Sequence, residues 1–258
     1  MKKSLKVVKI GGQLLQEKDR LKALLRDFVQ LEGPKILVHG GGPQASQIAQ
    51  QLDIPVRMHH GRRLTDHRTM EVLTMAYAGL NKQLTAKLLG LKCKALGLSG
   101  ADNGCIIAHK RPVEEIDYGY VGDIHKVDTD FINSLLNLGI TPVFSALSCT
   151  ANGELLNTNA DSVATKIAVA MAGIFQVELY FCFEKNGVLR ELSDPSSVIE
   201  ELNEENYLKL KKEGTIADGM LPKLENCFQG INQGIRYIYL GNEKMLGRNS
   251  KSTKILSS

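Results

Sequence analysis

Short apolar runs alternate along the chain with longer segments in which apolar residues recur every three or four positions. The short runs cover residues 5–10, 35–39, 93–98, 140–146, 177–181 and 236–240. Runs of this length and composition predict strands that are buried on both faces of a mainly parallel sheet. The longer segments predict helices over residues 17–31, 43–52, 67–89, 129–138, 160–171 and 203–212.

This alternation predicts an α/β fold in which helices cover a central sheet. In the longest predicted helix we expect four residues to face the core: Met70, Leu73, Met75 and Leu80. A chain of 258 residues can form one large domain or two lobes. We place a lobe boundary between residues 175 and 176, where a predicted helix ends and a predicted strand begins.

The composition excludes several protein classes. Hydrophobic residues make up 43% and charged residues 23%, which is typical of a folded globular chain and excludes extended disorder and coiled-coil repetition. Lys and Arg number 32 against 28 Asp and Glu, so the formal net charge is +4. Because the basic residues are scattered, we expect no nucleic-acid-binding arm, whereas a small anionic ligand remains possible.

The sequence also bears on location. Polar residues, Gly139 and Pro142 interrupt the uncharged stretch 131–153, and Lys6 and Lys9 interrupt any signal-peptide core, so we expect no membrane or export segment. The five cysteines are odd in number and never spaced as Cys-x-x-Cys, so we expect neither a disulfide framework nor a zinc site. Both observations predict a cytoplasmic protein.

Two glycine-rich turns follow the first two predicted strands. Gly11 and Gly12 end the first, and residues 40–42 end the second just before a predicted helix. Such turns can be simple strand-to-helix connections, but they also present main-chain N–H groups and a helix N-terminus to a phosphate. Lys9 lies inside the first apolar strand, where a buried lysine is rare unless it pairs with an anion. This lysine favours an anion-binding function.

Two further motifs carry charged residues near predicted helices. In residues 157–161, Asn159 can cap a helix and Asp161 suits its first turn, so an ordinary helix start is one interpretation. Lys223 follows the turn at residues 218–222 and, taken alone, is typical of a solvated surface. Together, two lysines, two glycine turns and an aspartate suffice in principle to move a phosphoryl group without a P-loop.

Other functions are compatible with parts of the pattern. Residues 40–45 also satisfy G-x-G-x-x-A, a dinucleotide-binding motif. In that motif an acidic residue about twenty positions later binds a ribose hydroxyl. This chain has Arg62 and Arg63 there, which could bind only the 2′-phosphate of NADP. Among dinucleotide-binding enzymes, an NADP-dependent oxidoreductase therefore stays open. A ligand sensor that keeps the fold without catalysis is a third possibility.

These motifs, in this order and at these spacings over nearly the whole chain, resemble the amino-acid kinase family. Within it, they resemble the enzymes of arginine biosynthesis that phosphorylate the γ-carboxylate of N-acetyl-L-glutamate. The segments that carry the resemblance are residues 9–12, 39–42, 61–66, 119–124, 157–161 and 218–223. The resemblance implies an open αβα sandwich with a mainly parallel, eight-stranded central sheet.

The resemblance also implies the organisation and ligands of the protein. Residues 1–175 would form an acyl-glutamate-binding and dimerisation lobe, and residues 176–258 a nucleotide-binding lobe. The substrates would be ATP with Mg²⁺ and the acyl-amino acid. Because arginine-inhibited relatives carry an extra amino-terminal helix and the first predicted strand here starts at about Leu5, we expect a homodimer that is insensitive to arginine.

Residue roles follow from the same resemblance. Lys9 and Lys223 would flank the transferring phosphoryl group, Asp161 would orient both lysines, and no protein metal ligand is implied. Gly11 and Gly12, with Lys223, would bind the nucleotide. The acyl-amino acid would be held by Gly41, Gly42, Arg63 and Asn157.

Two departures from the family pattern affect substrate contacts. Glu184 precedes the Gly-Val-Leu segment where the family usually has an Asp, so the nucleotide contacts are open. Arg62 stands where an uncharged residue is common. It is either a solvent-facing arginine or a partner for an additional carboxylate, as in N-succinyl-L-glutamate, which is therefore the alternative substrate.

Overall fold

The computed structural model describes residues 2–191, 193–216, 220–247 and 251–257. Eight strands form the central sheet in the order β12-β14-β13-β11-β1-β2-β8-β5. All neighbours pair in parallel except β13 and β14. In chain order the strands are β1 (Ser4–Ile10), β2 (Lys35–His39), β5 (Ala95–Leu98), β8 (Thr141–Phe144), β11 (Gln176–Cys182), β12 (Glu201–Leu202), β13 (Tyr237–Gly241) and β14 (Thr253–Ile255).

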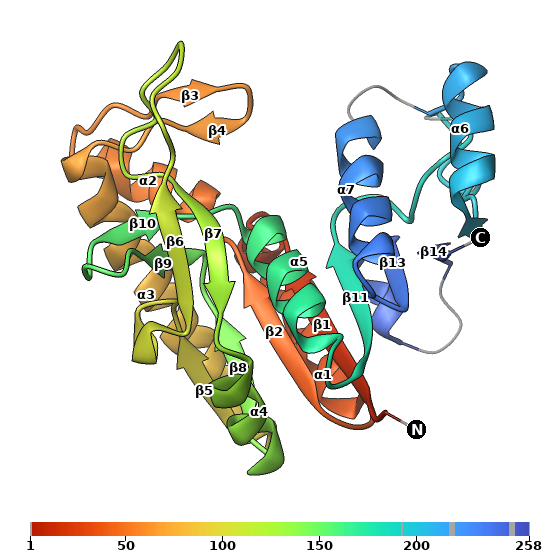
Figure 1. Ribbon diagram of the computed structural model, residues 1–258, viewed down its shortest axis with the longest axis horizontal. Coiled ribbons are helices and arrows are strands. Elements are labelled where there is room, and N and C mark those ends of the chain that lie inside the picture. Colours follow the sequence, from red (N-terminus) through yellow and green to blue (C-terminus); the bar gives the residue numbers. More distant parts are fainter. Residues whose placement is uncertain (1, 192, 217–219, 248–250, 258) are drawn as a thin grey trace.

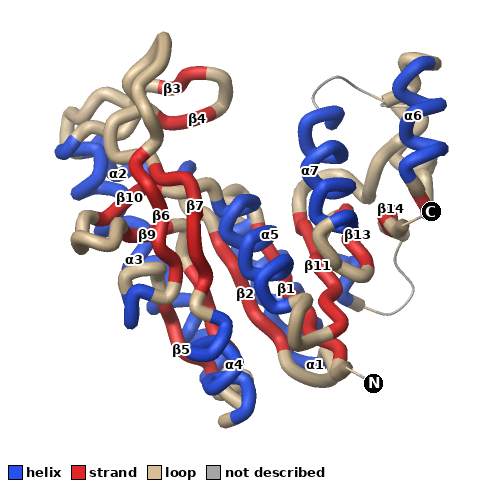
Figure 2. Tube along the Cα trace, in the orientation of Figure 1, coloured by secondary structure: helices blue, strands red, loops and turns tan. Residues whose placement is uncertain are grey.

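Helices cover both faces of this sheet (Figures 1 and 2). Helices α1 (Lys18–Gln30) and α3 (His67–Gly90) pack on one face, and α4 (Thr129–Asn137), α5 (Ala160–Met171) and α7 (Leu221–Asn232) pack on the other. The short helix α2 (Gly42–Gln51) packs against α3. This arrangement confirms the open αβα sandwich and its mainly parallel, eight-stranded sheet.

The alternation of side chains along β1 explains where its lysine points. Leu5 and Val7 are fully buried against the side of α5 and α7, whereas Val8 and Ile10 are fully buried against the side of α1 and α3. Successive residues of a strand point to opposite faces. Lys9 therefore shares the face of Val7 and is directed toward α5.

A second sheet, which the sequence did not predict, stands beside the carboxyl ends of the central strands. It has the order β10-β9-β6-β7, with β6 (Ile106–Lys110), β7 (Gly122–Val127), β9 (Leu147–Cys149) and β10 (Leu155–Asn157). A small hairpin of β3 (Met58–His59) and β4 (Arg62–Arg63) lies next to it (Figure 1). Strands β9 and β10 have only three residues each, too few for an alternation of apolar and polar positions to be detected. Strands β6 and β7 are longer, but their apolar residues do not alternate: Ile106, Ile107 and Ala108 are consecutive, and Ile124 and Val127 are three positions apart.

One core prediction was wrong. Met70, Leu73 and Leu80 are buried in α3, but 56% of Met75 is exposed. Three- and four-residue steps from Met70 reach Leu73, Tyr77 and Leu80 on one helical face, and Met75 lies off that face. The prediction that Met75 is buried rested on its hydrophobic side chain and not on its position around the helix.

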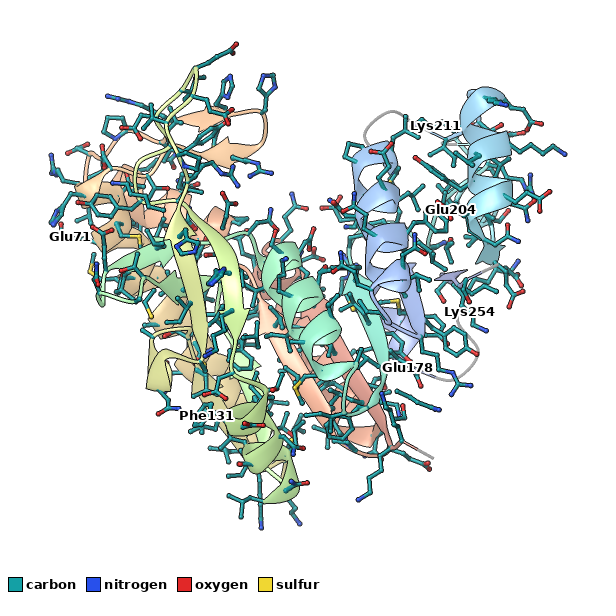
Figure 3. All side chains as sticks on the ribbon, viewed as in Figure 1. Glu71, Phe131, Glu178, Glu204, Lys211 and Lys254 are labelled. Carbon is teal, nitrogen blue, oxygen red and sulfur yellow. The ribbon has the colours of Figure 1, made fainter. Side chains whose placement is uncertain are left out.

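The carboxy-terminal part contains the edge strands β12 and β14 and helix α6 (Glu204–Lys212). Lys211 of α6 points toward α7 (Leu221–Asn232), where its Nζ lies 2.8 Å from Glu225 Oε1 (Figure 3). Three short 3-10 helices complete the described elements: η1 (Leu14–Gln16), η2 (Asp102–Gly104) and η4 (Glu243–Leu246). The central sheet continues across residue 175, because β11 pairs directly with β1. No helix within the described ranges is long and apolar enough to cross a membrane.

Candidate active site

The two glycine turns meet at the carboxyl edge of the sheet because β1 and β2 are neighbours. The Gly40 amide donates a hydrogen bond to Ile10 O over 3.4 Å, which joins the turns. A Cβ atom on Gly41 would come within 2.7 Å of Leu80 Cδ1 and 2.8 Å of Tyr77 Cδ1. Only glycine fits there, so α3 can approach the second turn closely and α2 can begin directly after it.

A buried polar chain, which the sequence did not reveal, supports the second turn. His39 is fully buried, and its Nδ1 lies 2.7 Å from Gly40 O while its Nε2 lies 3.0 Å from Asn81 Nδ2. Asn81, from α3, also donates to Val143 O over 2.8 Å. Because an amide nitrogen only donates, Nε2 of His39 accepts and Nδ1 carries the proton. Burial lowers the pKa of His39 to about 4, so the ring is neutral.

Lys9, Asp161 and Lys223 come together from β1, α5 and α7. Lys9 Nζ lies 2.7 Å from Asp161 Oδ1, and Lys223 Nζ lies 3.9 Å from Asp161 Oδ2. The side chains of the two lysines are only 14% and 24% exposed, and that of Asp161 is 40% exposed. Lys223 also lies 4.6 Å from the ring centre of Phe183 and 5.4 Å from that of Phe181. The aspartate therefore bridges two cations in a partly desolvated site.

The charge states of this cluster follow from its geometry. Burial acts to raise the pKa of Asp161, but the charges of Lys9 and Lys223 outweigh it and hold that pKa below its usual range. Burial lowers the pKa of Lys223, an effect that Asp161 opposes. At neutral pH the aspartate is ionised.

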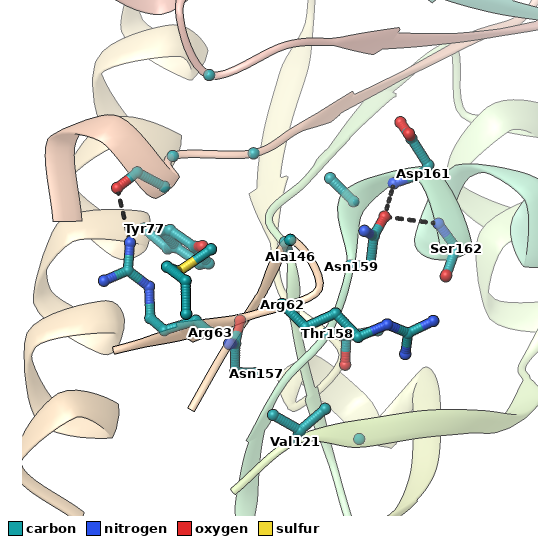
Figure 4. A pocket seen from close by; sticks show the side chains of 18 of the residues that line it. Arg62, Arg63, Tyr77, Val121, Ala146, Asn157, Thr158, Asn159, Asp161 and Ser162 are labelled. Atoms are coloured by element: carbon teal, nitrogen blue, oxygen red, sulfur yellow. Dashed lines mark hydrogen bonds between the residues drawn. The ribbon is translucent and has the colours of Figure 1, made fainter. Parts of the chain in front are cut away.

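The start of α5 separates two interpretations of Asp161. Asn159 Oδ1 accepts hydrogen bonds from the main-chain N–H groups of Asp161 and Ser162, at 2.7 Å and 3.3 Å (Figure 4). Capping is thus performed by Asn159, as the sequence predicted. The Asp161 carboxylate instead contacts the two lysines, so an ordinary helix start does not account for it.

A pocket of about 320 Å³ opens between the second glycine turn, the β3–β4 hairpin and α5. Gly41, Gly42, Arg63 and Asn157 all line it, so the structure brings together every residue expected at the acyl-amino acid. Arg63 is 9% exposed, and its Nη2 donates to Ser46 Oγ over 2.6 Å and to Gly42 O over 3.1 Å. Burial lowers the pKa of Arg63. Asn157 Nδ2 donates to Thr65 Oγ1 over 3.0 Å.

A second cavity of about 500 Å³ lies between α5 and α7, and Lys223 lines it. Four residues line both cavities: Arg62, Asn159, Asp161 and Ser162. Asp161 therefore marks the junction of two compartments, which suits a group transfer from a ligand in one to a ligand in the other.

The remaining expected residues lie close by. Gly12 lines the first pocket, and both Gly11 and Gly12 line a smaller crevice of about 240 Å³ that Glu184 also borders. Asp218 and Gly219, from the motif before Lys223, lie outside the described residues. Among the residues that the structure describes, no three His, Cys, Asp or Glu side chains gather as a metal-ligand set.

The β3–β4 hairpin is fastened to the segment before β7. Thr65 N donates to Tyr118 O over 3.0 Å, and Tyr120 N donates to Thr65 O over 2.7 Å. The ring of His59 lies within hydrogen-bond distance, 2.9 Å, of the Tyr118 hydroxyl. Between these contacts Gly119 adopts φ +69°, and a Cβ there would come within 2.1 Å of Thr65 O, so glycine is required. The hairpin is thereby held over the first pocket.

Comparison with known proteins finds relatives that are similar in sequence over more than nine-tenths of the chain. Acetylglutamate kinase of Bacteroides fragilis is 46% identical over 241 residues, which cover 93% of this chain and 92% of the relative. Acetylglutamate kinase of Methanopyrus kandleri is 37% identical over 243 residues, 92% of this chain and 95% of the relative.

Solved structures share the fold at low identity. N-acetylglutamate synthase of Neisseria gonorrhoeae superposes with a TM-score of 0.80 at 20% identity, covering 99% of this chain and 60% of the other. Carbamate kinase of Giardia lamblia bound to AMP-PNP superposes with a TM-score of 0.71 at 12% identity, covering 100% and 99%. The model of the amino acid kinase family matches residues 4–242, which include both glycine turns and all three residues of the charged cluster, and the chain belongs to that family.

Proposed function

We propose that this chain transfers the γ-phosphoryl group of ATP to the γ-carboxylate of N-acetyl-L-glutamate. The observation that carries the proposal is Asp161, which holds Lys9 and Lys223 at the junction of two cavities. The relatives named acetylglutamate kinase, at up to 46% identity, support this choice of acceptor.

Each cavity suits one substrate. In the first pocket, the guanidinium of Arg63 is largely shielded from solvent, which favours an α-carboxylate as its partner. Asn157 lines the same pocket. The cavity between α5 and α7 would take the nucleotide, with its phosphates directed toward Gly11, Gly12 and the start of α5. This assignment agrees with the expected division into lobes at residue 175, which remains part of the proposal.

The chemistry needs cations more than a general base. A γ-carboxylate is already ionised at neutral pH, so its oxygen can attack the γ-phosphorus directly. A new O–P bond forms, the bond from the γ-phosphorus to the β,γ-bridging oxygen breaks, and ADP leaves with that electron pair. Lys9 and Lys223 face the negative charge on the transferring group, and Asp161 fixes both ammonium groups before the reaction.

We propose that Mg²⁺ enters as the counter-ion of ATP. Because Asp161 is engaged by two lysines and the described residues contain no ready set of metal ligands, the ion would be held mainly by the phosphates. Mg²⁺ is commonly bound in this way, through substrate phosphates and water.

Trapping the acyl phosphate with hydroxylamine tests the proposal. We expect hydroxamate to form only when ATP, Mg²⁺ and N-acetyl-L-glutamate are all present, and L-glutamate serves as the control acceptor. No hydroxamate from any acyl-glutamate would refute the proposal. NADPH binding without product would favour the oxidoreductase alternative, and ligand binding without turnover would favour a sensor. N-succinyl-L-glutamate is included because it is the alternative acceptor. The homodimer and the cytoplasmic location remain predictions from the sequence.

A further inference from the structure

Arg62 is a charged residue that lines both cavities and has no role in the proposed function. It lies on β4 and is exposed, and it lines both the acyl pocket and the cavity between α5 and α7. Among the described residues its side chain has no hydrogen bond or ion pair within contact distance, although, together with Arg111, its charge helps to lower the pKa of the Asp123 carboxyl. All of its guanidinium N–H donors are therefore available to a ligand.

The two neighbouring arginines differ in direction. Figure 4 shows Arg63 turned toward Tyr77, whereas Arg62 extends past Thr158 toward the start of α5. Arg63 is tied to the second glycine turn by two hydrogen bonds. Arg62 therefore lies at the end of the pocket where Asp161 joins the two cavities, and away from the end that Arg63 forms.

The charges around this junction give Arg62 a function. Lys9 and Lys223 carry two positive charges and Asp161 one negative charge, so the cluster has a net charge of only +1. A carboxylate and a triphosphate that meet there bring several negative charges together. The acid near Arg62, Asp123, already forms a two-pronged ion pair with Arg111, and that pair is neutral. Arg62 adds one positive charge to that of the cluster, and Lys166 also lines the cavity between α5 and α7.

We propose that Arg62 binds the transferring phosphoryl group as a third cation, in addition to Lys9 and Lys223. A guanidinium matches a phosphoryl group with two parallel N–H donors. Because the β3–β4 hairpin lies over the acyl pocket, this contact also couples occupancy of that pocket to the nucleotide side. The inference rests on the proposed kinase function and assigns Arg62 to the phosphoryl group rather than to an acyl carboxylate.

The test compares Arg62→Leu and Arg62→Lys with Arg57→Leu. Arg57 is an exposed arginine of the segment leading into the same hairpin, and it lines none of the three cavities at the site. Its replacement therefore removes the same charge without touching the site. We expect Arg62→Leu to lower kcat by about tenfold or more, less than loss of a buried donor because Arg62 is exposed. Arg62→Lys should recover part of that loss, and Arg57→Leu should retain the parental kcat.

Two further measurements make the result decisive. Calorimetric binding of AMP-PNP with Mg²⁺ should weaken in Arg62→Leu and not in Arg57→Leu, and this readout does not depend on the acceptor. The ratio of kcat/KM for N-acetyl- and N-succinyl-L-glutamate should stay the same in Arg62→Leu. Unchanged kcat and nucleotide binding would overturn the inference, as would a selective loss of N-succinyl-L-glutamate turnover, which would assign Arg62 to the acyl group. A parent protein that forms no hydroxamate would instead refute the kinase proposal itself.

Discussion

Replacing Asp161 with asparagine removes the charge that pairs with both site lysines while keeping the shape of the side chain. The variant retains the Asn159 cap, because that cap contacts only main-chain N–H groups. Lys9 and Lys223, which are 14% and 24% exposed, are left without their shared partner and repel each other. We therefore expect a folded protein whose two ammonium groups are no longer held in place.

The size of the effect follows from burial and geometry. Removing one partner of a fully buried ion pair costs about 3–5 kcal/mol. The Asp161 side chain is 40% exposed and screened by solvent, so we expect a loss of about 1–2 kcal/mol in the free energy of unfolding. For a chain of this size that corresponds to a melting temperature lower by about 2–8 °C. Misplaced cations should lower kcat by about 10²-fold or more.

The assay measures kcat by hydroxamate formation and melting by circular dichroism. Asp130→Asn is the matched control, because Asp130 occupies the equivalent first turn of α4 and is exposed. It should lose about 0.3–1 kcal/mol through the helix dipole and retain full activity. If Asp161→Asn behaves like this control, with parental kcat and a small loss of stability, the role of Asp161 is confined to the helix start.

The pH dependence gives an independent check. The pKa of Asp161 is lowered in the folded protein, so its ionised form stabilises the fold above its unfolded pKa of about 4. That stabilisation is lost as pH falls through the lower folded pKa. The difference in melting temperature between parent and Asp161→Asn should therefore shrink below about pH 4. A constant difference down to pH 2 would show that charge is not its origin.

Three further predictions address the lysines, the buried polar chain and assembly. Lys9→Ala and Lys223→Ala should each lower kcat by about 10²-fold or more and weaken AMP-PNP binding less; near-parental kcat in either variant would remove that lysine from the proposed mechanism. Asn81→Ala should leave Nε2 of His39 unpaired and lower the free energy of unfolding, measured in urea, by about 1–3 kcal/mol. It should also lower kcat, because the second glycine turn loses its support; an unchanged free energy and kcat would contradict this role. Light scattering should give the mass of a dimer, and a hexamer would contradict that prediction. In the hydroxamate assay, millimolar arginine should leave the activity unchanged, and inhibition would contradict the expected insensitivity.

The pattern of the sequence by itself determined six of the eight strands of the central sheet and most helices, but not the edge strands β12 and β14 or helix α7. The runs at residues 5–10 and 177–181 are long, apolar and free of glycine, so they predict β1 and β11 closely. The helix predicted over residues 160–171 coincides with α5, because Asn159 provides a local capping signal. Such features depend on residues near one another in the chain.

Only the tertiary structure decided which distant groups meet. Lys9 and Lys223 are more than two hundred positions apart, and their contacts with Asp161 depend on the pairing of β1 with β11 and on the packing of α5 and α7 over that face. The second sheet left no clear local signal, because β9 and β10 are short and the apolar residues of β6 and β7 do not alternate with polar ones. The contact of Asn81 with His39 left none either, because a polar residue inside a helix does not indicate its partner. The direction of Arg62, toward the start of α5 and away from the guanidinium of Arg63, is likewise visible only in the folded structure. The local pattern of residues decides which helices and strands form, whereas the packing of these elements decides which of their side chains come into contact.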